Sequence, residues 1–213
     1  MMKIFKTLSL AAILLLFSCS QANWSKDELN TILNQGEVMR VLTVANPDDL
    51  DLLRRPCADF TPADLRGPVY AELSRKMVST VTSPEQDGVG IAGPQVGLSR
   101  RVVAVQRFDK QGEPFEVYPN IRIVARRGEL VPGPEGCLSV PGCRGIVGRY
   151  RDIDIRYTLL PSCRDTVETV KGFTAVIFQH ECDHLDGVLY TDYLKPEEVL
   201  TSDRPSDSVL QQN

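Results

Sequence analysis

Both histidines of this 213-residue chain lie within one run of five residues, His180-Glu181-Cys182-Asp183-His184. The residues around this run repeat at helical spacing and place one apolar face beside both imidazoles: Phe173, Val176, Ile177, His180 and His184. Histidines at positions i and i+4 lie one helical turn apart, so both can reach one metal ion. Glu181 stands beside them, where a carboxylate can hold or deprotonate water. The run therefore predicts a helix that ends near Gly187 and carries part of a metal site.

A core role is the alternative for these histidines, because an apolar helix face can bury imidazoles whose hydrogen bonds are satisfied. The metal interpretation is favoured because the chain has no histidine outside the motif. A catalytic metal site uses three protein ligands and leaves one position open. The third ligand therefore cannot be histidine, and Tyr190 stands where three-histidine proteases have their last one.

Two segments offer candidates for the third ligand. Glu197 and Glu198 lie downstream, but they follow the motif closely and border a polar tail. Cys137 lies upstream between turn-forming residues, in the run Glu135-Gly136-Cys137-Leu138-Ser139. A thiolate there would be a soft, anionic ligand, whereas a small buried thiol is the structural alternative. Cys137 is the better candidate.

Composition places the chain among ordinary globular proteins, with 42% hydrophobic residues and room for one domain with a substantial core. The 24 basic and 28 acidic residues give a formal net charge of −4. A mildly acidic chain without basic blocks is poorly suited to binding phosphate backbones. Nucleic acid is therefore not expected as a partner.

The expected architecture is α+β, with a long helix before a group of strands and the motif-bearing helix after them. A polar tether is expected at 20–36, with a short helix near Lys26–Asn34. Thr61-Pro62-Ala63-Asp64 is typical of a helix start, and Gly67-Pro68 either divides that helix or begins it. The helix carries an apolar stripe at Val69, Leu73, Met77 and Val81. Short apolar or alternating runs predict strands at 102–105, 121–124, 153–157 and 167–170.

The first nineteen residues have the pattern of a secretory signal. Lys3 and Lys6 precede a short apolar run at 8–17, and a membrane-spanning helix needs about 20 residues. The run ends in Leu16-Phe17-Ser18-Cys19, which resembles the bacterial lipoprotein processing box. The resemblance implies a lipid on Cys19 and a place in the cell envelope. An ordinary signal peptide, or an uncleaved apolar tail on a cytoplasmic protein, is the alternative.

Export would expose the cysteines to oxidising conditions, where disulfides form. The spacing of these cysteines favours no particular pairing, so we predict none: Cys57, Cys143, Cys163 and Cys182.

A glycine-rich segment at Gly88–Gln95 contains the spacing of a dinucleotide-binding fingerprint. That fingerprint must follow a strand and open a helix, whereas this segment follows a predicted helix and precedes a strand. The dinucleotide interpretation therefore fails. Glycines here more plausibly let backbone approach a ligand closely.

Together the three segments resemble the peptide deformylase family. The similarity covers about residues 40–195, and each family motif has its counterpart: the glycine-rich run ending in Gln95, EGCLS at 135–139, and QHExDH at 179–184. Gly93 departs from the alanine usual in the family, and we expect it to add backbone freedom near the substrate. The long C-terminal helix of some members is also missing.

The resemblance implies a single α+β domain at 37–195, built of mixed or antiparallel sheets around a central motif-bearing helix. The polar composition after Lys195 predicts a flexible tail at 196–213. The resemblance also implies a metal-dependent hydrolase that removes the formyl group from N-formylmethionyl peptides and releases formate. Cys137, His180 and His184 are the implied ligands of one divalent metal. The family prefers Fe(II) and accepts zinc, nickel or cobalt.

The implied catalytic groups are Glu181, Gln95 and Leu138. Glu181 takes a proton from the attacking water and returns it to the leaving amine, while the Gln95 side-chain amide and the Leu138 backbone N–H stabilise charge on the formyl oxygen. Asp183 orients neighbours of the metal, and Cys182 belongs to the core.

The implied substrate contacts lie along the peptide backbone or in a methionine pocket, with Arg144 near the downstream residues: Val89, Gly90, Glu135, Gly136, Arg144 and Ile177. A membrane is expected as a partner only through a lipid on Cys19. An envelope lipoprotein that binds formylated peptides without turnover is the alternative function.

Overall fold

The computed structural model describes residues 22–201. The predicted signal segment with Cys19, and the end of the predicted tail at 202–213, lie outside the described residues. Within residues 22–201, no helix combines the length and apolar character needed to span a membrane.

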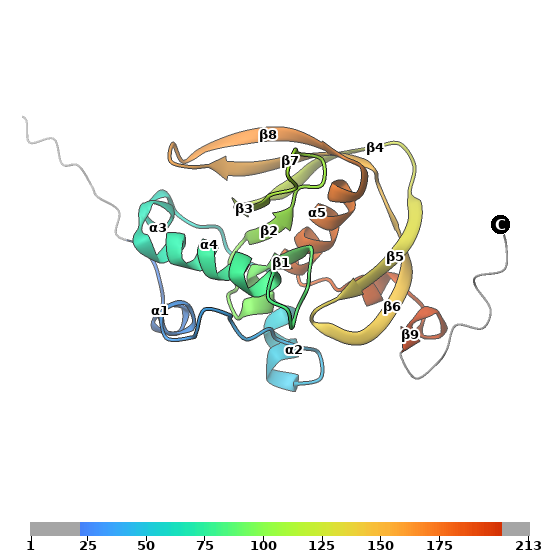
Figure 1. The fold of residues 1–213 in the computed structure, drawn as a ribbon, viewed down its shortest axis with the longest axis horizontal. Helices are drawn as coiled ribbons and strands as arrows, with labels where there is room; N and C mark the ends of the chain where they lie inside the picture. Colours follow the sequence, from blue (N-terminus) through green and yellow to red (C-terminus); the bar gives the residue numbers. More distant parts are fainter. Residues whose placement is uncertain (1–21, 202–213) are drawn as a thin grey trace, which may run out of the picture.

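Three small antiparallel sheets surround one central helix, α5 (Gly172–Leu185), as Figure 1 shows. The sheets have the strand orders β1-β2-β3, β4-β7-β8 and β5-β6-β9. The strand bounds are β1 Gly90–Ala92, β2 Val102–Gln106, β3 Phe115–Pro119, β4 Arg122–Arg127, β5 Val131–Cys137, β6 Val140–Arg149, β7 Asp152–Leu159, β8 Arg164–Lys171 and β9 Leu200–Thr201. The α+β prediction is confirmed.

Helices α1 to α4 lie on one side of this assembly (Figure 1). Their bounds are α1 Lys26–Leu33, α2 Pro47–Leu53, α3 Pro62–Arg66 and α4 Pro68–Val81, with short 3-10 helices η1 Gly93–Val96, η2 Tyr190–Tyr193 and η3 Pro196–Glu198. The predicted helix start at Thr61 is confirmed, because its side chain accepts from Asp64 N–H in a capping box. Gly67 divides the predicted helix into α3 and α4, and Pro68 begins the second.

Helix α5 ends where its sequence predicts. It starts at Gly172, and Gly187 follows its end with a φ of +76°, a left-handed conformation that glycine adopts without strain. A side chain at position 187 would also overlap the backbone of Arg54 at the end of α2. The close approach of these two segments therefore depends on the glycine.

The four predicted strands are confirmed as β2, β4, β7 and β8, whereas the β5–β6 hairpin was not predicted. Glycine and proline interrupt β5, which reads VPGPEGC, so it lacks the alternating apolar pattern of a half-buried strand. Its stability comes from long antiparallel pairing with β6, from Val131↔Arg149 to Gly136↔Arg144.

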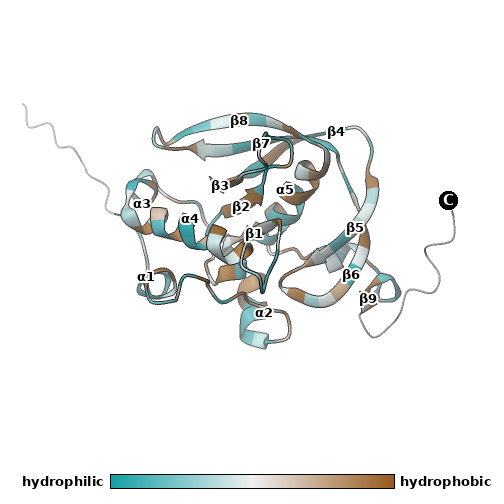
Figure 2. Ribbon diagram, in the orientation of Figure 1, coloured by the Kyte–Doolittle hydropathy of each residue, from teal (hydrophilic) through white to brown (hydrophobic). Residues whose placement is uncertain are grey.

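The core lies on both faces of β2, where apolar residues concentrate between α4 and α5 (Figure 2). Val103 and Val105 pack in the cluster around α5, while Val102 and Ala104 face the cluster around α4. Cys182 is buried in the α5 cluster, as predicted. Core packing therefore holds the buried side of α5 in place, independently of any bound ligand.

The segment predicted as a tether, 20–36, is packed onto the domain where the structure describes it. Ile32 of α1 is fully buried against α4. The Lys76 ammonium donates to the carbonyls of Ile32 and Gln35, both at 2.7 Å. Glu28 is paired with the buried Arg100 guanidinium. The tether interpretation is wrong for this part because one apolar side chain and two buried cations tie down a mostly polar sequence.

The tail predicted from residue 196 also differs from the structure in its first six residues. They form η3 and then β9, which pairs antiparallel with β6 through Arg144↔Leu200 and Cys143↔Thr201. A strand of two residues has no periodic signal of its own, so the local sequence did not indicate it.

Candidate metal centre

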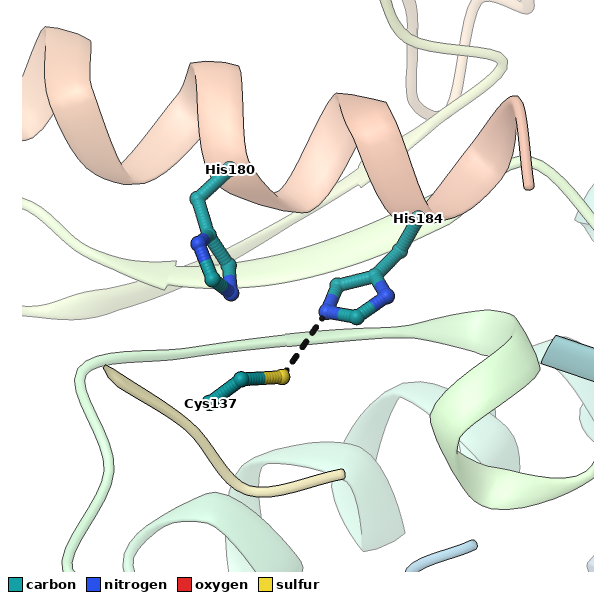
Figure 3. Close-up of side chains that lie close together, drawn as sticks. All are labelled: Cys137, His180 and His184. Carbon is teal, nitrogen blue, oxygen red and sulfur yellow. Dashed lines mark hydrogen bonds between the residues drawn. The ribbon is translucent and has the colours of Figure 1, made fainter. Parts of the chain in front are cut away.

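Three side chains from two elements, helix α5 and strand β5, point toward one another. His180 and His184 come from adjacent turns of α5, and Cys137 comes from the end of β5 (Figure 3). The Sγ of Cys137 lies 3.2 Å from the Nε2 of His184, and one ligand atom from each residue lies within 4.8 Å of the others. A thiolate with two imidazole nitrogens is a donor set suited to a divalent transition metal, so these residues fit such an ion.

The β5–β6 hairpin positions the Cys137 sulfur. Regular pairing breaks between Gly136 and Cys137, and Cys137 then pairs with Val140 across a two-residue turn. Within that turn the Ser139 N–H points at the Cys137 sulfur from 3.4 Å. The side chain therefore faces α5, as Figure 3 shows.

A chain of charged hydrogen bonds orients the His180 ring. Its Nδ1 lies 2.8 Å from a Glu135 carboxylate oxygen, which leaves Nε2 for a metal. Arg149 donates to both Glu135 oxygens, at 2.7 and 3.1 Å, and to Asp183 at 2.6 Å. Burial raises the pKa of Glu135, but His180 and Arg149 outweigh that effect and lower it to about 2. Glu135 is therefore a permanent acceptor for the ring.

The two histidines have opposite pKa shifts. Burial lowers the pKa of His184 well below its ordinary value, which keeps its Nε2 lone pair available. Burial also lowers the pKa of His180, but the sulfur of Cys137 and the carboxylate of Glu135 outweigh it and raise the value well above the ordinary one. Because a metal binds the neutral imidazole, a proton competes with the metal at His180.

Glu181 lies beside the ligands with the properties of a proton-transfer group. Glu181 is 4% exposed, and burial, opposed by His180, raises the pKa of its carboxyl to about 7. Its Oε2 has no hydrogen-bond partner within the described part of the chain. Gly90 of β1 makes room for it, because a Cβ there would lie 2.5 Å from Oε1 and 2.8 Å from Ile177. The carboxyl can thus gain and lose a proton near neutral pH.

Gln95 presents its side-chain N–H groups to the same cleft. Its Oε1 accepts from Ala92 N–H at 2.8 Å, which fixes the orientation of the amide. The Nε2 then points at the Cys137 sulfur, 3.5 Å away, and at the Ser139 hydroxyl, 3.2 Å away. The amide is therefore a fixed hydrogen-bond donor within the cleft, as an oxyanion site requires.

A cavity of about 910 Å³ opens onto these groups. All six predicted substrate contacts line it, together with Leu138: Val89, Gly90, Glu135, Gly136, Arg144 and Ile177. The Glu135 carboxylate is already bound by His180 and Arg149, so it belongs to the hydrogen-bond network of the metal centre. For all six residues, contact with a substrate stays a prediction.

The expectation that Gly93 adds backbone freedom is wrong. A Cβ at this position would overlap the carbonyl oxygen of Arg100 and lie 3.0 Å from that of Leu98. The glycine instead permits close packing of η1 against the following loop. This packing supports Gln95, which lies in the same short helix.

Sequence reasoning missed the role of Arg149. It is 5% exposed and links Glu135 of the hairpin to Asp183 of α5. The alternation along β6 carried a signal, because Val147 and Arg149 fall on the same inward face. An arginine on an inward face needs an acidic partner, and Glu135 is the acid of the neighbouring motif.

Comparison with known proteins supports one family. A family model described as polypeptide deformylase matches residues 38–199. The peptide deformylase of Leptospira biflexa is 35% identical over 169 residues, which are 74% of this chain and 88% of that protein. Peptide deformylase 2 of a Nostoc species is 37% identical over 162 residues, 73% of this chain and 86% of that one.

Solved structures agree with the sequence comparison. The actinonin-bound class I type b peptide deformylase from Acinetobacter baumannii matches with a TM-score of 0.64 and 33% identity, over 74% of this chain and 99% of that one. The Thermotoga maritima peptide deformylase matches with a TM-score of 0.63 and 29% identity, over 75% and 99%. The chain therefore belongs to the polypeptide deformylase family of enzymes.

Proposed function

We propose that this enzyme removes the formyl group from the N-terminal formylmethionine of peptides or nascent proteins and releases formate. The observation that carries the proposal is a Cys-His-His ligand set beside a buried carboxyl with a pKa near 7. The names of the relatives support it, as do structures of the Acinetobacter enzyme with actinonin and with Met-Ala-Ser bound.

Cys137, His180 and His184 would hold one divalent metal, for which we propose Fe(II), with zinc, nickel or cobalt as substitutes. Such an ion supplies Lewis acidity, which makes water more acidic and polarises a carbonyl group. The thiolate contributes a negative charge to the ligand set. The Glu135–His180 hydrogen bond raises the basicity of one imidazole and fixes its tautomer.

Glu181 carries the proton in the proposed reaction. It accepts a proton from water as the water oxygen attacks the formyl carbon, and then gives that proton to the leaving amine nitrogen. The C–N bond breaks, and the products are formate and a free methionine amine. A pKa of about 7 suits both roles, because the carboxyl is neither strongly acidic nor strongly basic at neutral pH.

The negative charge that develops on the formyl oxygen needs nearby donors. The Gln95 amide is held in place by Ala92 N–H and directs its own N–H groups into the cleft. The Leu138 backbone N–H is the second proposed donor. Removing one such donor typically lowers turnover by a factor of about 10²–10³.

The test is formate release from formyl-Met-Ala-Ser by protein purified without oxygen and supplied with Fe(II). We expect turnover by the wild type and a loss of about 10²–10⁴-fold in Glu181→Gln, with metal content unchanged. Unformylated Met-Ala-Ser should remain uncut, which separates this activity from a peptidase. Equal turnover by the two proteins would remove Glu181 from the mechanism.

The alternative, a lipoprotein that binds formylated peptides without turnover, has no support within residues 22–201. Binding alone requires neither Glu181 nor Gln95, yet both are present and face the cleft. The cell-envelope location remains our proposal from the sequence. Labelling cells with a palmitate analogue tests it, since label should appear on the wild type and disappear in Cys19→Ala; an unlabelled wild type would contradict it.

A further inference from the structure

The end of η2 and the segment after it pack on the face of β6 that carries Gly145 and Arg149. The ring of Tyr193 lies 4.9 Å from the guanidinium of Arg149. The Leu194 side chain packs directly on Gly145, where a Cβ would overlap it. These contacts direct the following residues, including η3, along the hairpin and back toward the cleft.

β9 then adds a third strand beside the metal centre. Leu200 pairs with Arg144, which in turn pairs with Gly136, the residue before the Cys137 ligand. The Leu200 side chain lines the same cavity as Cys137 and Glu181. Successive side chains of a strand alternate between faces, and the preceding residue, Val199, is absent from the cavity wall. Leu200 is thus the apolar side chain that β9 contributes to the cleft.

The separation of Leu200 from Gly136, the neighbour of the Cys137 ligand, indicates which residue of a bound peptide it can contact. Two strand spacings separate Leu200 from Gly136, and each is about 4.8 Å, so the two positions are about 10 Å apart. An extended peptide advances about 3.3 Å per residue. A peptide whose formyl group lies at the metal centre and whose chain runs from β5 toward β9 would reach this distance with its third residue.

Building on the proposed function, we propose that Leu200 is a specificity-determining residue that contacts the third residue of a formylated peptide. Its side chain offers an apolar surface, so it favours an apolar residue at that position over a small polar one. The C-terminal segment is thereby part of the substrate cleft. The family motifs, which end at His184, do not include it.

The experiment compares kcat/KM for formyl-Met-Ala-Leu, formyl-Met-Ala-Ser and the shorter formyl-Met-Ala. Wild-type enzyme should favour the leucine peptide. Leu200→Ala should lower kcat/KM for that peptide about fivefold, because burial of a single methylene group changes affinity by about fourfold. The same variant should leave formyl-Met-Ala within about twofold. Val199→Ala is the matched control and should change none of the three values.

Two kinetic results would overturn the inference. One is a Leu200→Ala variant with unchanged values for all three peptides, and the other is an equal loss on formyl-Met-Ala and formyl-Met-Ala-Leu. A wild type that releases no formate contradicts the proposed function, and calorimetric binding of Met-Ala-Leu and Met-Ala-Ser then decides the role of Leu200. A dissociation constant for Met-Ala-Leu that rises about fivefold in Leu200→Ala supports the contact, and equal constants in both proteins refute it.

Discussion

Arg149→Met is the substitution for which the structure predicts the clearest cost. The guanidinium makes three hydrogen bonds, two to Glu135 and one to Asp183, between 2.6 and 3.1 Å. The arginine is 5% exposed, and Glu135 is 7% exposed. Methionine fills a similar space but removes the arginine charge from both carboxylates and leaves Glu135 with the His180 ring alone.

Removing one partner of a buried ion pair typically costs about 3–5 kcal/mol, because the other charge stays buried and uncompensated. A domain of this size has about 5–15 kcal/mol of total stability, so the loss is a large fraction of it. The melting temperature should fall by about 10 °C. Urea unfolding followed by circular dichroism, with a chelator present, measures the free energy without a contribution from metal.

The unfolding free energy that Arg149→Met loses should depend on pH in a defined direction. In the wild type the pKa of Glu135 is held at about 2, below its ordinary value of about 4.3 in an unfolded chain. The stabilisation is therefore complete above about pH 4.3 and is lost as the pH falls toward 2. The difference between wild type and Arg149→Met should narrow over the same range.

Arg127→Met is the matched control, since Arg127 also bonds two aspartates, Asp152 and Asp154, but is 48% exposed. Arg127→Met should lower the unfolding free energy by only a small part of the Arg149→Met effect, because water can solvate the exposed aspartates in place of the arginine. Adding Glu135→Gln to Arg149→Met should recover some stability by removing a buried charge that has lost its arginine. Equal costs for the two arginine substitutions would show that burial does not control this interaction.

Three further outcomes follow from the described contacts. Gly93→Ala should cost about 1–3 kcal/mol in urea unfolding, because its Cβ overlaps the Arg100 carbonyl, whereas Gly36→Ala, in open space, should cost far less. Asp64→Asn should destabilise at pH 7. Burial raises the Asp64 pKa, but hydrogen bonds lower it overall. The stability lost in Asp64→Asn should therefore shrink below about pH 3.9. Chelation should lower the melting temperature of metal-loaded wild type, and should leave Cys137→Ala unchanged because that variant lacks a ligand.

Short-range sequence patterns predicted helix α5 and two of the three side chains of the candidate metal centre. His180 and His184 are four residues apart on a helix, so their common direction follows from helical geometry alone. Cys137 was identified as the better third candidate because no other histidine exists, and the family resemblance then assigned it as a ligand. Its sulfur meets the imidazoles only because the hairpin turn after β5 aims it at α5.

Contacts between distant segments could not be predicted in the same way. Arg149 reaches Glu135 because β5 and β6 pair in one register, and a shift of one residue would turn its side chain to the other face. The packing of α1 depends on Lys76, whose burial no local pattern indicates. The pairing of Leu200 with Arg144 depends on where the chain returns after η2. Each is a property of the assembled fold.

Arg149 and the metal ligands connect the same two elements, since each set joins the β5–β6 hairpin to α5. Loss of a group that supports a metal-ligating histidine typically weakens metal binding about 10–100-fold, and Arg149 supports His180 through Glu135. That factor corresponds to about 1.4–2.7 kcal/mol. By thermodynamic linkage, the cost of Arg149→Met must be greater by this amount in metal-saturated protein than in chelated protein. The change in zinc affinity, measured by chelator competition, gives this coupling free energy. The difference between the unfolding costs of Arg149→Met with metal and with chelator gives the same quantity independently. If affinity falls but the two unfolding costs are equal, then Arg149 does not act through the metal centre of the folded protein.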